Sequence, residues 1–102
     1  MKQVIAVVKP FLAEKVVEAL RRAPLEALTV REVRGYGRQK DQLDRYEQSE
    51  YALAFLPKVE ISFAVPLDIV EEMTARVART ARTGRIGDGK VFVVPTVWEG
   101  EF

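Results

Sequence analysis

The chain contains neither cysteine nor histidine. Without cysteine it has no disulfide framework and no thiolate metal site. Without histidine it also lacks a common ligand of zinc and copper, and it cannot form a Ser-His or Cys-His nucleophile pair. These two absences exclude the enzyme classes that depend on such groups.

Long apolar runs and a strong net charge are missing as well. No apolar stretch approaches the ~18 residues that indicate a membrane helix. The first residues lead into a strand pattern without a small-residue cleavage site. Lys and Arg number 16 against 15 Asp and Glu, for a formal net charge of +1, so no global field points to nucleic acid or a membrane surface. We expect a cytoplasmic protein with one domain over residues 1–102.

Residues 82–90 read Arg-Thr-Gly-Arg-Ile-Gly-Asp-Gly-Lys and hold the strongest binding signal. Main-chain N–H groups in a glycine-rich loop, together with cations, can cradle a phosphate. The spacing from Gly84 to Lys90 fits most of the phosphate-loop pattern. However, Val91 replaces the Ser or Thr of that pattern, and a helix is expected before the loop instead of after it. The segment is therefore either a phosphate site of another kind or a glycine-rich helix-to-strand turn.

Strand and helix patterns alternate along the rest of the chain in two similar halves. Strands are expected at 3–9, 28–34, 58–65 and 91–94. Helical faces are formed by Leu12, Val16, Ala19 and Leu20, and by Val70, Met73, Val77 and Ala81. Asp68 with Glu71 resembles a capping box and predicts an N-terminal cap for the second helix. The order predicts an α+β, ferredoxin-like double βαβ fold with an antiparallel sheet.

The second face of that sheet needs a cover. Helices in this fold cover one face, so strands with a solvated outer face should alternate in polarity. Residues 4–8 and 91–94 are apolar at both parities. We therefore expect a homo-oligomer in which the sheets face inward.

Residues 38–55 show no clear period and mix charges of both signs. A stretch of this length without a pattern is most often functional or disordered in a compact domain. A β-hairpin with an obscured pattern is the alternative.

Five segments carry a further signal: 7–11 (VVKPF), 35–40 (GYGRQK), 49–51 (SEY), 55–59 (FLPKV) and 81–90 (ARTGRIGDGK). In this order and spacing they closely resemble the PII signal proteins, which are trimeric nucleotide sensors of nitrogen and carbon metabolism. The resemblance covers essentially the whole chain. It implies a T-loop at about 37–55 that docks on target proteins. It also implies a B-loop at about 82–90 that holds ATP or ADP phosphates in a cleft between subunits.

The resemblance also implies roles for single residues. Phosphates would contact Gly87, Asp88, Gly89 and Lys90, with Arg38 reaching in from the base of the T-loop. The adenosine side would be lined by Thr29, Gly35 and Gly37.

Two residues are implied in binding 2-oxoglutarate. Gln39 would hold Mg²⁺ together with the nucleotide phosphates and 2-oxoglutarate, and Lys58 would pair with a carboxylate of that acid. A divalent cation is a reasonable link, because it holds a dianion beside a triphosphate and prefers oxygen ligands. Lys58 adds a compact positive charge. Taken singly, Gln39 also fits a plain polar loop residue and Lys58 a solvated lysine at a strand end.

Two T-loop residues match positions that are modified in some members. Tyr51 stands where some are uridylylated, and Ser49 stands where cyanobacterial members are phosphorylated.

One segment departs from the family pattern. Typical members carry two arginines after the last strand that grip the nucleotide, whereas residues 98–102 read Trp-Glu-Gly-Glu-Phe, with Glu101 near one of those positions. We expect weaker ATP binding than in such relatives, or a shifted preference among ATP, ADP and AMP. Short-ended PII-like variants that are not tied to nitrogen control also fit this departure.

The leading hypothesis is a homotrimeric regulator rather than an enzyme. Adenine nucleotides, with Mg²⁺ and 2-oxoglutarate, would set the T-loop conformation, and the loop would bind a target enzyme or transporter. A membrane would be reached only through a transporter. The alternatives are an energy sensor that ignores 2-oxoglutarate and a slow ATPase. No nucleic-acid partner is expected, because Phe63 and Phe92 lie in core-like strands and no basic face is indicated.

Overall fold

The structure is a computed structural model that describes residues 1–35, 56–84 and 89–96. In these ranges the elements are β1 (Lys2–Val8), α1 (Pro10–Leu20), β2 (Glu26–Gly35), β3 (Leu56–Val65), the 3-10 turn η3 (Leu67–Ile69), α3 (Val70–Ala81) and β4 (Gly89–Pro95). The expected strands and helices are all present, with ends that differ by a few residues.

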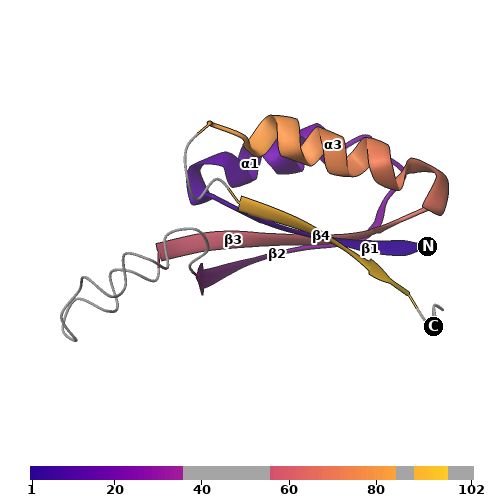
Figure 1. The fold of residues 1–102 in the computed structure, drawn as a ribbon, viewed down its shortest axis with the longest axis horizontal. Helices are drawn as coiled ribbons and strands as arrows, with labels where there is room; N and C mark the ends of the chain where they lie inside the picture. Colours follow the sequence, from indigo (N-terminus) through magenta and orange to yellow (C-terminus); the bar gives the residue numbers. More distant parts are fainter. Residues whose placement is uncertain (36–55, 85–88, 97–102) are drawn as a thin grey trace.

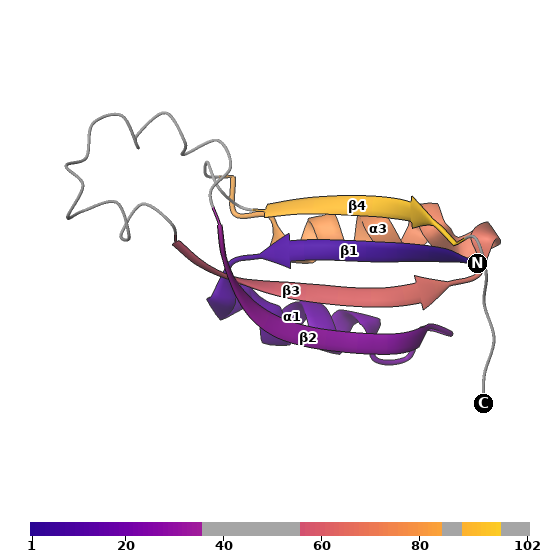
Figure 2. The same ribbon diagram turned by 90° about the horizontal axis from the view of Figure 1, so that it is seen from below.

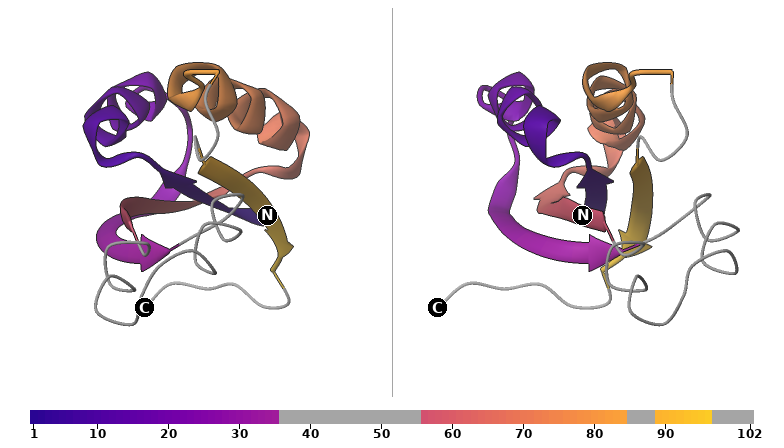
Figure 3. Two further views of the ribbon diagram at one scale, coloured as in Figure 1. Left: turned by 60° about the vertical axis from the view of Figure 1, so that its left-hand side comes forward. Right: turned by 90° about the vertical axis from the view of Figure 1, so that its left-hand side faces the viewer.

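The strands form one antiparallel sheet in the order β2-β3-β1-β4 (Figure 2). Both helices lie next to each other on one face of this sheet (Figure 1, Figure 3). Each βαβ unit is split, because the strand between its two parallel members comes from the other half of the chain. This arrangement confirms the ferredoxin-like α+β fold.

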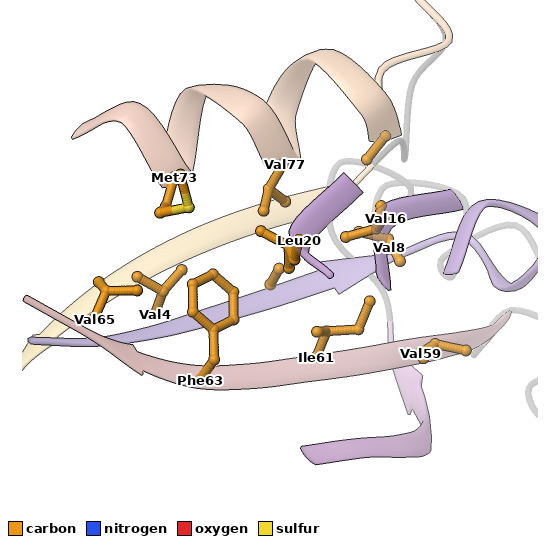
Figure 4. Close-up of a cluster of buried hydrophobic side chains, with 12 residues drawn as sticks. Val4, Val8, Val16, Leu20, Val59, Ile61, Phe63, Val65, Met73 and Val77 are labelled. Atoms are coloured by element: carbon orange, nitrogen blue, oxygen red, sulfur yellow. The ribbon is translucent and has the colours of Figure 1, made fainter. Parts of the chain in front are cut away.

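The core lies between the sheet and the helices, and its residues follow the expected periods (Figure 4). Alternate residues of β1 and β3 point toward the helices, and each helix returns one apolar stripe. The buried members are Val4, Ala6, Val8, Leu12, Val16, Leu20, Val59, Ile61, Phe63, Val65, Met73, Val77 and Ala81.

The starts of the two helices differ from each other. Pro10 occupies the first turn of α1, where its fixed φ and missing N–H cost nothing. The expected Asp68 cap is wrong: Asp68 lies within η3, and Ile69 precedes α3 without a side-chain cap. Asp68 precedes the helix by two residues, within a turn in which the Ile69 N–H donates to the Pro66 carbonyl oxygen at 3.2 Å.

The start of β2 contains an irregularity that the sequence does not indicate. Glu26 pairs with Ala64 and Thr29 with Ser62, so two residues of β2 face one residue of β3. Ala27 takes a left-handed conformation there, with φ +53°. This bulge lets β2 continue along β3 after the register shift.

The sheet face away from the helices, here called the outer face, carries apolar side chains on β1 and β4. Register places Phe92 opposite Ile5 and Val94 opposite Gln3 on this face. Phe92 is 49% exposed in the single chain, whereas Phe63 is 1% exposed. The expectation of a core-like Phe92 is therefore wrong, because its parity points away from the helices. Cover by another copy stays a prediction.

Neither helix in the described ranges is long and apolar enough to cross a membrane.

Candidate functional site

One end of the sheet gathers the ends of four strands. Gly35 at the end of β2 pairs with Leu56 at the start of β3, and Val8 at the end of β1 pairs with Gly89 at the start of β4. The last turn of α3, at Ala81, lies near the same end (Figure 1, Figure 2). We call this region the loop end of the sheet, because the chain leaves it and returns to it at residues 35 and 56 and at residues 84 and 89.

An open pocket of about 260 Å³ lies at the loop end. It is lined by the end of β1, the start of β4 and the last turn of α3. Its lining is mainly apolar, including Val8, Val77 and Val91, and it also includes the cationic residues Arg82 and Lys90. An apolar wall beside two cations suits an organic anion better than a bare inorganic ion.

Gly89 and Lys90 are the first two residues of β4, so this strand begins within the segment predicted as the B-loop. Gly89 pairs with Val8, and Lys90 pairs with Val7. Gly89 has φ +144°, and a Cβ built on it would collide with the carbonyl oxygen of Val7. Glycine is therefore required at this position by the close approach of two strands, whatever it contributes to a ligand.

Lys58 lies on the outer face at the loop end. It pairs with Val33 and alternates along β3 with the buried Val59. The residue is only 7% exposed, which is unusual for lysine unless its ammonium group is paired.

A side-chain hydrogen bond joins the junction of β1 and α1 to the segment after α3. The Lys9 Nζ donates to Thr83 Oγ1 at 3.5 Å. Gly84 follows with φ +85°, so the backbone turns there in a conformation that favours glycine. Residues 83 and 84, which follow α3, are therefore positioned by this hydrogen bond and this turn.

An ion pair occupies the same outer face. Arg31 of β2 and Glu60 of β3 are in register, and the guanidinium and carboxylate meet through two hydrogen bonds of 3.2 Å. Neither residue was singled out from the sequence. The alternation of β3 places Glu60 on the outer face, but its partner could be found only once the register of β2 was known.

The structure brings some of the predicted site residues together and separates others. Gly35, Lys58, Gly89 and Lys90 all lie at the loop end. Thr29 lies on β2 opposite Ser62, and the sheet order places β2 and β4 at opposite edges. Thr29 and Lys90 of one chain are therefore separated by β3 and β1.

The remaining predicted residues lie outside the described ranges. They are Gly37, Arg38, Gln39, Ser49, Tyr51, Gly87 and Asp88.

Arg82 lines the pocket. The sequence indicated it as one of the cations of the glycine-rich segment and as a favourable cation at the end of a helix, without a contact of its own to a ligand. Its position beside β4 depends on how α3 packs across the sheet, which single-sequence patterns do not encode.

Metal-binding groups can also be assessed in the described part of the chain. Those residues contain no group of three acidic side chains that could hold a metal ion. A Mg²⁺ ion near Lys58 and Lys90 would fit only if ligand phosphates supplied most of its oxygen ligands, which is a common arrangement for this ion.

Comparison with known proteins gives the family. A family model described as nitrogen regulatory protein P-II matches residues 1–97. The chain belongs to the P-II family. It is 48% identical over 93 residues to the nitrogen regulatory protein P-II of Rhizobium etli, covering 91% of this chain and 83% of the relative. The same values hold for nitrogen regulatory protein P-II 1 of Escherichia coli K12. A P-II protein of Bradyrhizobium diazoefficiens is 46% identical over the same shares.

Membership in the P-II family supports a role in signal transduction, since these relatives are regulatory proteins by name. It also confirms the resemblance drawn from the five sequence segments.

Proposed function

We propose that this P-II family member binds ATP or ADP at the loop end of the sheet and regulates a target enzyme or transporter through residues 37–55. The observation that carries the proposal is an apolar pocket at that end whose lining includes the cationic residues Arg82 and Lys90. The apolar lining suits a base or ribose, and the cations suit phosphates.

The same end connects ligand binding to the regulatory segment. Gly35 and Leu56, which bracket residues 36–55, pair with each other two residues beyond the Val33–Lys58 pair. A ligand held by Lys58 and Lys90 would therefore sit beside the base of that segment. The ligand would favour the arrangement of the segment that adds contacts to it, and Arg38 would make the added contact with the phosphates.

Mg²⁺ and 2-oxoglutarate are part of the proposal. The ion would be held by nucleotide phosphates and Gln39, and it would supply the positive charge that keeps two anions together. Lys58 would pair with a carboxylate of 2-oxoglutarate. Its low exposure strengthens any such pair, because a charge screened less by water interacts more strongly.

The separation of Thr29 and Lys90 supports a site shared between copies. In one chain these residues lie at opposite edges of the sheet. A nucleotide that contacts both would need Thr29 from a second copy. The apolar outer face gives the copies a surface on which to associate, and we propose a homotrimer located in the cytoplasm.

A Lys90→Ala variant tests the phosphate contact. We expect its affinity for ATP and ADP to fall about tenfold or more, because an ammonium–phosphate contact is lost. Lys15→Ala is the matched control, since Lys15 is exposed on α1 and distant in sequence from every site residue. Calorimetric titration measures both variants. Equal affinities of Lys90→Ala and Lys15→Ala would contradict the proposed contact.

A further inference from the structure

Glu60 is a carboxylate set among cations on the outer face of the sheet. Its oxygens accept from the Arg31 Nε and Nη2 at 3.2 Å each. The Glu60 side chain is 19% exposed, whereas that of Arg31 is 71% exposed. Its charge is therefore only partly screened by water.

The register places two further cations near Glu60 on this face. Lys58 precedes it by two residues on β3, about 7 Å along the strand. Glu60 pairs with Val7, and Val7 pairs with Lys90, so Glu60 and Lys90 lie in one row across three strands. These two lysines are the ones that the proposed function assigns to anionic ligands.

We propose that Glu60, on the outer face, sets the charge selectivity for ligands held by Lys58 and Lys90. The inference rests on the proposed nucleotide-binding function and concerns which ligands the site prefers. The carboxylate of Glu60 partly neutralises the neighbouring cations. It also repels an anionic ligand in proportion to the negative charge of that ligand. It therefore favours AMP and ADP over ATP, and it opposes a dicarboxylate at Lys58.

Coulomb's law sets the size of the effect. Glu60 and Lys90 are two strand spacings apart, which is about 10 Å. At that distance a unit charge in water changes the affinity of a ligand by about twofold per ligand charge at low salt. Over the charge difference between AMP and ATP this becomes a difference of several-fold. The effect should fall as salt rises, because the Debye length at 0.1 M is about 10 Å.

A purely structural ion pair predicts a different pattern. If the Arg31–Glu60 ion pair only stabilises the pairing of β2 with β3, removing either partner disturbs the sheet in the same way. Both substitutions would then weaken binding, for charged and uncharged ligands alike. Charge selection instead predicts opposite signs for the two substitutions.

The test compares Glu60→Gln and Arg31→Gln with the unaltered chain, using calorimetric titration of adenosine, AMP, ADP and ATP without Mg²⁺. At low salt, Glu60→Gln should leave adenosine unchanged, tighten AMP about fourfold and tighten ATP about sixteenfold. Arg31→Gln should have the opposite sign: it should weaken nucleotide binding, with ATP affected most and AMP least. In a separate titration with Mg²⁺ and ATP present, 2-oxoglutarate should bind more tightly to Glu60→Gln than to the unaltered chain.

Glu32→Gln is the matched control. Glu32 pairs with the buried Val59, so it lies on the helix-side face of β2, and its substitution removes the same charge. It should shift each nucleotide by clearly less than Glu60→Gln does, because Glu32 lies one strand further from Lys90. Thermal unfolding of each variant shows whether the sheet has been disturbed.

The outcomes separate the two proposals. In one outcome, nucleotides bind but Glu60→Gln changes the affinity of all of them, and of adenosine, by the same factor. That result overturns the charge-selection role and leaves the proposed function standing. If neither the unaltered chain nor Glu60→Gln binds nucleotides, both the charge-selection role and the proposed function are overturned. Binding that appears only in Glu60→Gln supports charge selection and shows that the unaltered site excludes these anions.

Discussion

At Gly89 the backbone of β4 approaches β1 so closely that no side chain fits. A Cβ there would collide with the Val7 carbonyl oxygen, and φ is +144°. Gly84 is also left-handed, with φ +85°, but a Cβ there would meet no atom within 4 Å. Comparing substitutions at the two glycines therefore distinguishes the cost of an unfavourable φ from the cost of a steric collision.

Gly89→Ala should lower the free energy of unfolding by at least about 2 kcal/mol, because it adds a collision to an unfavourable φ. Gly84→Ala should cost about 1 kcal/mol, since only the left-handed conformation is penalised. Urea unfolding at equal protein concentration measures both. The account fails at this position if Gly89→Ala is no more costly than Gly84→Ala.

Residues with unusual backbone conformations mark what the sequence could not predict. Ala27 has positive φ in the bulge of β2 although alanine has no preference for it. Asp68 has the spacing of a cap and still lies inside a 3-10 turn. Both conformations are imposed by the connection between larger elements, so local patterns were silent or misleading.

The two helices are joined by one side chain as well as by apolar packing. Arg76 of α3 donates through Nη1 to the carbonyl oxygen of Ala19 in α1 at 3.3 Å, and through Nη2 to Glu72 Oε1 at 2.9 Å. The contact satisfies one of the carbonyl groups that the end of α1 leaves without a helical partner. It therefore fixes α3 against the C-terminal turn of α1.

Arg76→Met should lower the free energy of unfolding by about 1 kcal/mol, because it keeps the apolar stem and removes the hydrogen bonds. Arg79→Met is the control, since Arg79 is exposed on the same helix, and should change stability by less than about 0.5 kcal/mol. Chemical denaturation measures the difference. A cost shared equally by both variants would show that the contact with Ala19 contributes nothing.

Elements were predicted better than their assembly. The periods of 3.6 and 2 located both helices and the strands, because buried stripes leave a direct mark in the sequence. The register of β2 on β3 leaves no such mark, so the Arg31–Glu60 pair appeared only in the structure. The parity of Phe92 was equally undecided until the helices were placed on one face.

The candidate site shows the same division. Lys58, Gly89 and Lys90 were chosen by family resemblance, and strand pairing brings them to one end of the sheet. Arg82 was indicated as a cation of the glycine-rich segment, but its place beside β4 depends on the packing of α3 and could not be predicted.

The outer face is the surface through which copies of the chain are predicted to associate. Phe92 and Val94 are exposed there in the single chain and lie in register with residues of β1. A carboxylate at this apolar surface would have to be buried without a partner when copies pack face to face.

Phe92→Asp should therefore shift the protein from an oligomer to a monomer, measured by sedimentation velocity or light scattering. Leu67→Asp is the control, because Leu67 is 67% exposed in η3, away from the outer face, and it should leave the mass unchanged. A monomeric unaltered chain, or an intact oligomer in Phe92→Asp, would contradict association through this face.

Calorimetric titration of the unaltered protein with ATP and ADP, with Mg²⁺ and with or without 2-oxoglutarate, tests the central claim most directly. The account predicts saturable binding of both nucleotides, with 2-oxoglutarate binding only when Mg²⁺ and ATP are also present. Nucleotide binding without any response to 2-oxoglutarate would keep the nucleotide site and remove the assigned role of Lys58. No saturable binding of ATP or ADP would contradict the proposed function as a whole.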